Sequence, residues 1–244
     1  MPIKEQWLYS GLGVSHYKVD VQDYQRCIGS LMYLIVYTHP DIAYSVGVLS
    51  CHVTCPGKPY LQAVKHVFWY LCGTSHYKLE FRGNSFIGSP FISYENLDWV
   101  GDCLDRKSIS GSAILMDGGT VLWGSKKQSC VVLSIVELEF ITALAVVKEV
   151  IWIRLLFNSL IMPLTDPTCI LINNQGALDL IKSGQINNRT KHIEMHFRHI
   201  CDCKETGIIQ AEYVATTEQV ADIMTKSLGS EKFHYFWVRI GVGQ

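Results

Sequence analysis

The chain has 244 residues with a formal net charge of −1, and 48% of them are hydrophobic. This length and apolar content allow a sizeable core, which excludes global disorder. The near-neutral charge excludes a protein that attracts nucleic acid through its overall field, so any such binding must use local basic groups.

Helical periodicity dominates the first third of the chain. Apolar residues at helical spacing predict helices over residues 24–37, 41–51 and 60–72. The first is expected to stop before Pro40, because proline disfavours helix in the residue that precedes it. Turn-forming residues over 81–90 predict a boundary between a small helical segment, residues 1–88, and a second domain, residues 89–244.

The second domain alternates strands and helices. Strands are expected over residues 91–96, 111–116, 120–123, 131–133, 169–173 and 208–214. Helices are expected over residues 136–160, 175–182, 189–206 and 218–228. Asp117-Gly118-Gly119 predicts a hairpin turn. Consecutive strands followed by alternating units predict an α/β domain with a mixed sheet.

Short strings in the second domain carry a family resemblance. They read DWVGD (98–102), DRKSISG (105–111), WGSKKQS (123–129), LSIVELEFI (133–141), NNQGA (173–177), RTKHI (189–193) and ADIMTK (221–226). In this order they resemble the ribonuclease H domain at the C-terminal end of copia-type (Ty1-like) LTR retrotransposon Pol polyproteins. YQRCIGSLMY (24–33) and HPDIAY (39–44) resemble the end of the reverse transcriptase region that precedes it. The resemblance implies a ribonuclease H-like mixed five-stranded sheet with flanking helices.

The resemblance also implies a catalytic site. Ribonuclease H folds hold two Mg²⁺ ions with four carboxylates, which cleave the RNA of an RNA/DNA hybrid. The matching positions here are Asn96, Glu139, Asn173 and Asp222. Glu139 and Asp222 keep the metal-ligand carboxylate, whereas amides replace the other two. Asp98, two residues along the strand from Asn96, is an alternative ligand.

The amides are expected to impair metal binding. Asparagine keeps a carbonyl oxygen but has no charge. One unit-charge interaction at about 4 Å is on the order of 4 kcal/mol at an effective dielectric near 20. We therefore expect weak Mg²⁺ binding and a degenerate, inactive site. The alternatives are a weakly active nuclease that uses Mn²⁺, and a co-opted module that binds nucleic acid or protein.

Basic residues within the family-like strings are candidate contacts to the phosphates of a hybrid. They are Arg106, Lys107, Lys126, Lys127, Arg189 and Lys191. The stretch 195–200 departs from the family pattern, which puts the packing of its helix in doubt. The expected partners are RNA/DNA hybrid and, ancestrally, the rest of the Pol polyprotein. YxDD polymerase, DTG or DSG protease and HHCC integrase strings are absent.

The chain is expected to be soluble and intracellular, in the cytoplasm or nucleus, with no membrane partner. Its first residues have no apolar stretch typical of a signal peptide, and no apolar run reaches the about 18 residues of a membrane span. Nine cysteines at irregular spacing predict reduced thiols. Cys51, His52 and Cys55, or Cys201 and Cys203, lack the spacing of a metal half-site.

Overall fold

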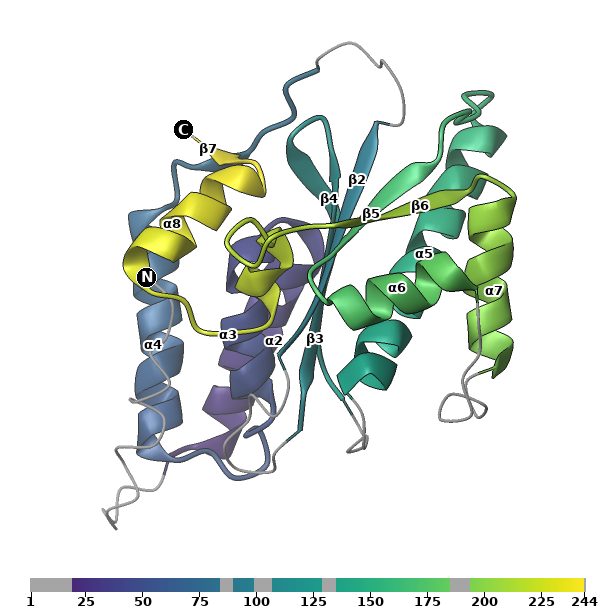
Figure 1. The fold of residues 1–244 in the computed structure, drawn as a ribbon. Helices are drawn as coiled ribbons and strands as arrows, with labels where there is room; N and C mark the ends of the chain where they lie inside the picture. The colour runs from purple at the N-terminus through teal and green to yellow at the C-terminus, as the bar shows by residue number, and fades with distance from the viewer. Residues whose placement is uncertain (1–18, 84–89, 99–106, 129–134, 185–193, 244) are drawn as a thin grey trace.

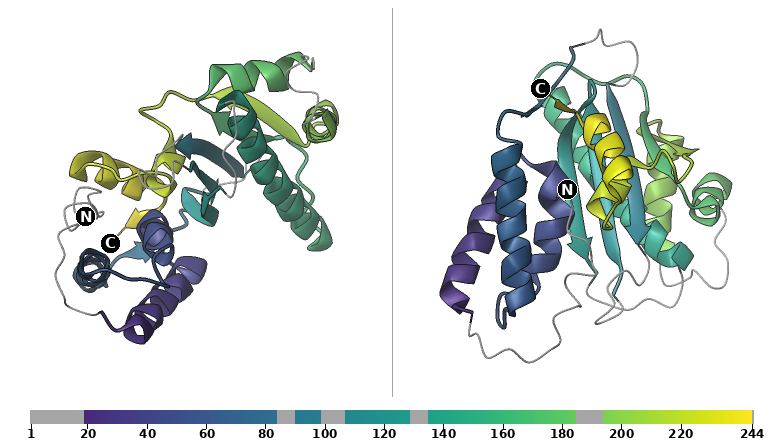
Figure 2. Two further views of the ribbon diagram at one scale, coloured as in Figure 1. Left: turned by 90° about the horizontal axis from the view of Figure 1, so that it is seen from below. Right: turned by 90° about the vertical axis from the view of Figure 1, so that its left-hand side faces the viewer.

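The computed structural model describes residues 19–83, 90–98, 107–128, 135–184 and 194–243. A five-stranded sheet lies at its centre, with helices on both faces (Figure 1). Figure 2 shows the same layers from two further directions. None of the described helices combines the length and apolar character that a membrane span requires.

The sheet is mixed. Its strands are β2 (Phe91–Asp98), β3 (Ile109–Met116), β4 (Gly119–Lys127), β5 (Thr168–Ile172) and β6 (Ile209–Tyr213). They lie in the order β4-β3-β2-β5-β6. β3 is antiparallel to both β2 and β4, whereas β2, β5 and β6 run parallel to one another. This confirms the predicted fold class, an α/β domain with a ribonuclease H-like sheet.

Three helices cover one face of the sheet. They are α5 (Ile135–Ser159), α6 (Gln175–Ser183) and α7 (Glu194–Glu205). Phe140 of α5 stacks on Phe197 of α7 with ring centroids 5.7 Å apart, and Ile200 is also fully buried. The departure of residues 195–200 from the family pattern therefore does not remove the apolar face of this helix.

The other face carries the N-terminal helices and the C-terminal elements together. They are α2 (Val21–Tyr37), η1 (Pro40–Ile42), α3 (Ala43–Ser50), α4 (Lys58–Gly73), η3 (Val220–Met224) and α8 (Ser230–Arg239). A two-stranded sheet joins β1 (Lys78–Leu79) to β7 (Val242–Gly243). Residues from both ends of the chain, such as Ala43 and Phe236, share one buried cluster.

Most predicted elements are confirmed to within a few residues. The hairpin turn is made by Asp117 and Gly118, whose φ angles of 50° and 81° place both in the left-handed region typical of a two-residue turn. The predicted strand over 131–133, the boundary at residue 88 and the first part of the helix predicted over 189–206 lie outside the described residues. The division into 1–88 and 89–244 stays a prediction.

The helix predicted over 218–228 is wrong. The chain forms the short 3₁₀ helix η3 there, and the last α-helix, α8, follows it and was not predicted. Gln219 causes the early turn, because its backbone carbonyl accepts from the N–H of Asp222 three residues on and its side chain accepts from Ala221. The signal for α8 was the helical spacing of Phe233, Phe236 and Trp237.

The seven described cysteines are free thiols. Cys103 and Cys130 lie outside the described residues.

The end of α5 is strained at one residue. Ile161 has a φ of 62°, and the N–H of Met162 donates to Phe157 while that of Ile161 donates to Asn158, the Schellman pattern in which glycine is usual. Its side chain is 90% exposed, so it contributes little burial. We expect Ile161→Gly to raise the free energy of unfolding by about 1 kcal/mol. Urea denaturation measures this, and a loss of stability would contradict the strain.

Candidate active site

Gly111 allows η3 to lie directly on the sheet. It pairs with Asn96 across β2 and β3. A Cβ at this position would come 2.5 Å from Cγ2 of Thr225 and 2.8 Å from Cβ of Met224, closer than real Cβ contacts. Only glycine lets the two backbones approach this closely. The consequence is that the buried side chains of η3 reach the middle strand of the sheet.

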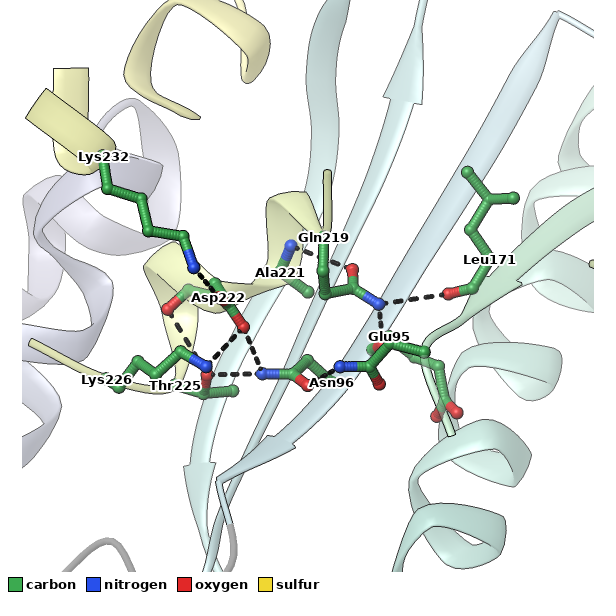
Figure 3. A network of polar contacts seen from close by, with 10 residues as sticks. Glu95, Asn96, Leu171, Gln219, Ala221, Asp222, Thr225, Lys226 and Lys232 are labelled. Carbon is green, nitrogen blue, oxygen red and sulfur yellow. Dashed lines mark hydrogen bonds and ion pairs between the residues drawn. The ribbon is translucent and has the colours of Figure 1, made fainter. Parts of the chain in front are cut away.

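Asn96 is the centre of the polar network in Figure 3. Its Nδ2 donates to Oδ1 of Asp222 at 2.8 Å and to Oγ1 of Thr225 at 2.9 Å. Its Oδ1 accepts from Nδ2 of Asn173 at 3.0 Å. The network therefore joins three of the four predicted site residues, Asn96, Asn173 and Asp222, although they are far apart in the sequence.

The chemistry of Asp222 fixes the orientation of the amide. An ionised carboxylate only accepts hydrogen bonds, so the group facing Asp222 must be the NH₂ of Asn96 rather than its oxygen. The oxygen of Asn96 then faces Asn173, which must donate. An aspartate at position 96 would instead set two carboxylates against each other at hydrogen-bond distance. The two asparagines thus fit each other and Asp222, although Oδ1 of Asn173 is buried without a hydrogen-bond partner among the described residues.

Asp222 is fully buried and doubly ion-paired. Nζ of Lys226 lies 2.8 Å from its Oδ1, and Nζ of Lys232 lies 2.7 Å from its Oδ2. Both lysine side chains are partly exposed, at 30% and 38%. Charge-assisted hydrogen bonds of this kind compensate the cost of burying a carboxylate. Both carboxylate oxygens therefore already have cationic partners.

Glu139 lies beside this network rather than within it. It is buried on α5, and the side chain of Asn174, next to Asn173, hydrogen-bonds to it. Burial raises its pKa to about 7, an effect that the Asn174 hydrogen bond partly offsets. Its Oε2 has no hydrogen-bond partner among the described residues.

Glu95 is a second buried acid that the sequence reasoning missed. It precedes Asn96 on β2, so its side chain lies on the opposite face of the strand. Neither carboxylate oxygen has a hydrogen-bond partner among the described residues, and burial, followed by the charge of Glu139, raises the pKa of Glu95 well above its usual value. The available signal was that the residues two positions away on the same face of the strand, Ser93 and Leu97, are uncharged.

The buried pair predicts an inverse dependence of stability on pH. Both pKa values are raised in the folded protein, so the folded state binds more protons, and stability falls as pH rises from about 4.5 through about 7. Glu95→Gln keeps the neutral shape. It should unfold like the original protein at pH 5 and be more stable at pH 8 by more than about 1 kcal/mol. Equal stability of the two proteins at pH 8 would contradict this, and Glu149→Gln, at an exposed position of α5, serves as the control.

Of the other residues predicted from the sequence, some lie on β2, β3 or β4 or next to them, and the rest lie outside the described residues. Asp98 is the last residue of β2 and half-buried. Lys126 is exposed and Lys127 half-buried at the end of β4, opposite Ser110 and Ile109 of β3. Lys107 is half-buried just before β3. Arg106, Arg189 and Lys191 lie outside the described residues.

The residues present do not fit the pair of Mg²⁺ ions that the resemblance implies. Such a pair needs several negatively charged oxygens converging on one place. Asn96 instead turns hydrogen atoms toward Asp222, and lysine ammonium groups already lie against both oxygens of that carboxylate. Among the described residues, no group of three or more histidine, cysteine or acidic side chains is placed to hold a metal ion.

Comparison with known proteins gives several relatives. The chain is 36% identical over 211 residues to the retrovirus-related Pol polyprotein from transposon TNT 1-94 of Nicotiana tabacum, covering 86% of this chain and 16% of that protein. It is 34% identical over 236 residues to the one from transposon RE1 of Arabidopsis thaliana, covering 96% and 16%. The chain thus spans about a sixth of the length of these relatives.

A shorter relative is named as an effector protein and not as a Pol polyprotein. The chain is 40% identical over 131 residues to the secreted RxLR effector protein 161 of Plasmopara viticola, which covers 53% of this chain and 90% of that protein. No family model and no solved structure matches the chain.

Proposed function

We propose that this chain, which is similar to the retrovirus-related Pol polyproteins of plant transposons, is a ribonuclease H-like domain that has lost its nuclease activity. The ancestral reaction is hydrolysis of RNA in RNA/DNA hybrids with two Mg²⁺ ions. The strand order of the sheet and the convergence of Asn96, Asn173 and Asp222 support this origin.

One observation carries the proposed loss of activity. The amide of Asn96 donates to the buried carboxylate of Asp222, where catalysis would require a second carboxylate to share a cation. Hydrogen bonds within the protein, together with Lys226 and Lys232, take the place of metal coordination. A cation approaching Asp222 would have to displace two ammonium groups and would find no charge at Asn96 or Asn173.

The test is a cleavage assay on a labelled RNA/DNA hybrid. We expect no cleavage above background with Mg²⁺, and none with Mn²⁺. Cleavage that Glu139→Gln abolishes would contradict the loss of activity and support a weak nuclease. Cleavage that survives Glu139→Gln would point to a contaminating nuclease or to a wrong site assignment. Asp222→Ala separates the two: an inactive preparation of this variant would exclude a contaminant and leave the wrong site assignment.

A second candidate function is a retained binding module. The observation that favours it is the Plasmopara viticola relative, 90% of which aligns with this chain, so that a segment of this type makes up almost a whole protein. Lys107, Lys126 and Lys127 keep basic groups near the end of the β3–β4 hairpin. Salt-dependent binding of hybrid without cleavage would support this candidate. Binding that Lys126→Ala leaves unchanged would contradict the assignment of the basic groups.

A further inference from the structure

A cleft lies away from the Asn96 network, on the side of the sheet that carries the N-terminal helices. It has a volume of about 600 Å³ and is bordered by the ends of α2 and α4, by η1, β1, β4 and α8. α2, α4 and α8 are on the same side of the sheet (Figure 1). Aromatic residues form much of its wall: Tyr37, Tyr77, Phe81, Trp123 and Trp237. Its volume is that of a small-ligand site with mainly apolar walls.

A buried carboxylate opens into this cleft. Asp41, from the HPDIAY string, is 7% exposed and lines it. Its Oδ2 accepts from Nε1 of Trp237 at 3.3 Å and from the hydroxyl of Tyr70. Burial and then the charge of Asp41 raise the pKa of Tyr70, which keeps this hydroxyl a donor. Oδ1 of Asp41 has no hydrogen bond to a described residue.

Among the described residues, no cation lies within ion-pair distance of Asp41. The ion pairs of the described residues do not include it, and both of its donors are neutral. Buried carboxylates are normally paired with a cation, because isolated burial is costly. Lys78 lines the same cleft but is exposed, where water and salt screen its charge.

We propose that this cleft binds an alkylammonium group, with Oδ1 of Asp41 as its counter-ion and Trp123, Trp237 and Tyr37 as the surrounding aromatic wall. Aromatic faces attract cations, and their apolar surface covers the methylene or methyl groups of such a ligand. An anion would be repelled by Asp41, and a neutral ligand would leave its charge uncompensated. A metal ion would find one carboxylate and the imidazole of His39, and the described residues supply no third histidine, cysteine or acidic side chain to complete a ligand set.

Two sources offer this chemistry, a free amine and the side chain of a lysine, methylated or not, on another protein. Calorimetric titration of the full chain with choline and with a short peptide that contains one trimethyl-lysine distinguishes them. Tighter binding of the peptide by tenfold or more indicates a protein side chain, and equal or weaker binding indicates a free amine. Both results support the proposal. The proposal is overturned if neither choline nor the peptide shows saturable binding.

The isostere 3,3-dimethylbutan-1-ol tests the role of charge, because it has the shape of choline without the cation. We expect it not to bind, and equal binding of the two would overturn the proposal. Asp41→Asn keeps the acceptor for Tyr70 and Trp237 and should weaken choline binding at least tenfold, whereas Glu149→Gln, on exposed α5 surface, should leave it unchanged. If circular dichroism shows that Asp41→Asn does not fold, the choline affinity of Tyr37→Leu is measured instead. Tyr37 is 64% exposed, so its loss is tolerable, and unchanged affinity there overturns the proposal.

Discussion

Replacing Asn96 and Asn173 together with aspartate is expected to make the stability of the protein depend on Mg²⁺. In the metal-free protein, a carboxylate at position 96 would lie at hydrogen-bond distance from Asp222, and one at position 173 would lie beside it. Such repulsion destabilises the folded state until a cation or a proton joins the group. We expect a loss of about 2–4 kcal/mol without metal. Millimolar Mg²⁺ should recover most of it, measured as the shift in Tm.

The same variant should regain some cleavage of RNA/DNA hybrid, if the proposed origin is right. Either single replacement should regain much less, because the two ions act as one unit and the effects are non-additive. Adding Glu139→Gln should abolish the recovered cleavage. A double variant whose Tm does not respond to Mg²⁺ would contradict the site assignment. A variant that binds Mg²⁺ but stays inactive would place further damage outside the metal-binding positions.

Removing the carboxylate of Asp222 should destabilise the original protein by about 3 kcal/mol. Asp222→Ala removes one of the two acceptors of the buried Asn96 amide and the shared counter-ion of the partly exposed Lys226 and Lys232. The sign of this change in stability distinguishes an empty metal site from a network of hydrogen bonds and ion pairs. In a metal site without its metal, carboxylates repel one another and losing one relieves strain, whereas in a satisfied network losing the acceptor is costly.

Chemical denaturation at neutral pH measures the change. Lys232→Met serves as the comparison, because Asp222 then keeps Lys226 and Asn96, and the expected loss is no more than about 1.5 kcal/mol. Stability of Asp222→Ala equal to or above that of the original protein would contradict the network interpretation. It would favour an intact metal site in its unloaded form.

The fold was largely predictable because its periodic signals are strong. The strand predicted over residues 169–173 and the Asp117-Gly118 turn each match one physical rule, and both elements formed to within one residue of the expected bounds. The structure of the region after Gln219 was not predictable, because it depends on a side-chain contact. Nε2 of Gln219 donates to the backbone oxygen of Glu95 at 2.7 Å and holds η3 against the sheet. Such a contact has no local sequence signal.

The sequence predicted several residues that the fold brings together but not the contacts among them, and their role as a site stays a prediction. Family order alone was enough to choose Asn96, Asn173 and Asp222, which the fold brings into contact. Sequence could not show that Lys232, ten residues beyond Asp222, would reach its carboxylate, since α8 itself was not foreseen. Nor could it show that the carboxyl of Glu95 would lie in apolar surroundings near Glu139.

The pairing of β1 with β7 has a consequence for how the molecule folds. Lys78 and Leu79 lie opposite Gly243 and Val242 in the antiparallel pair, and the N–H of Glu80 donates to the backbone oxygen of Gly241 at 2.7 Å. On a ribosome, α2, α3 and α4 emerge long before the residues that complete their shared core with α8. Contacts between distant parts of a chain form slowly, because a long loop must close first. During synthesis, α2, α3 and α4 therefore expose apolar surface until α8 has been made. We expect chaperones to bind this surface in that period.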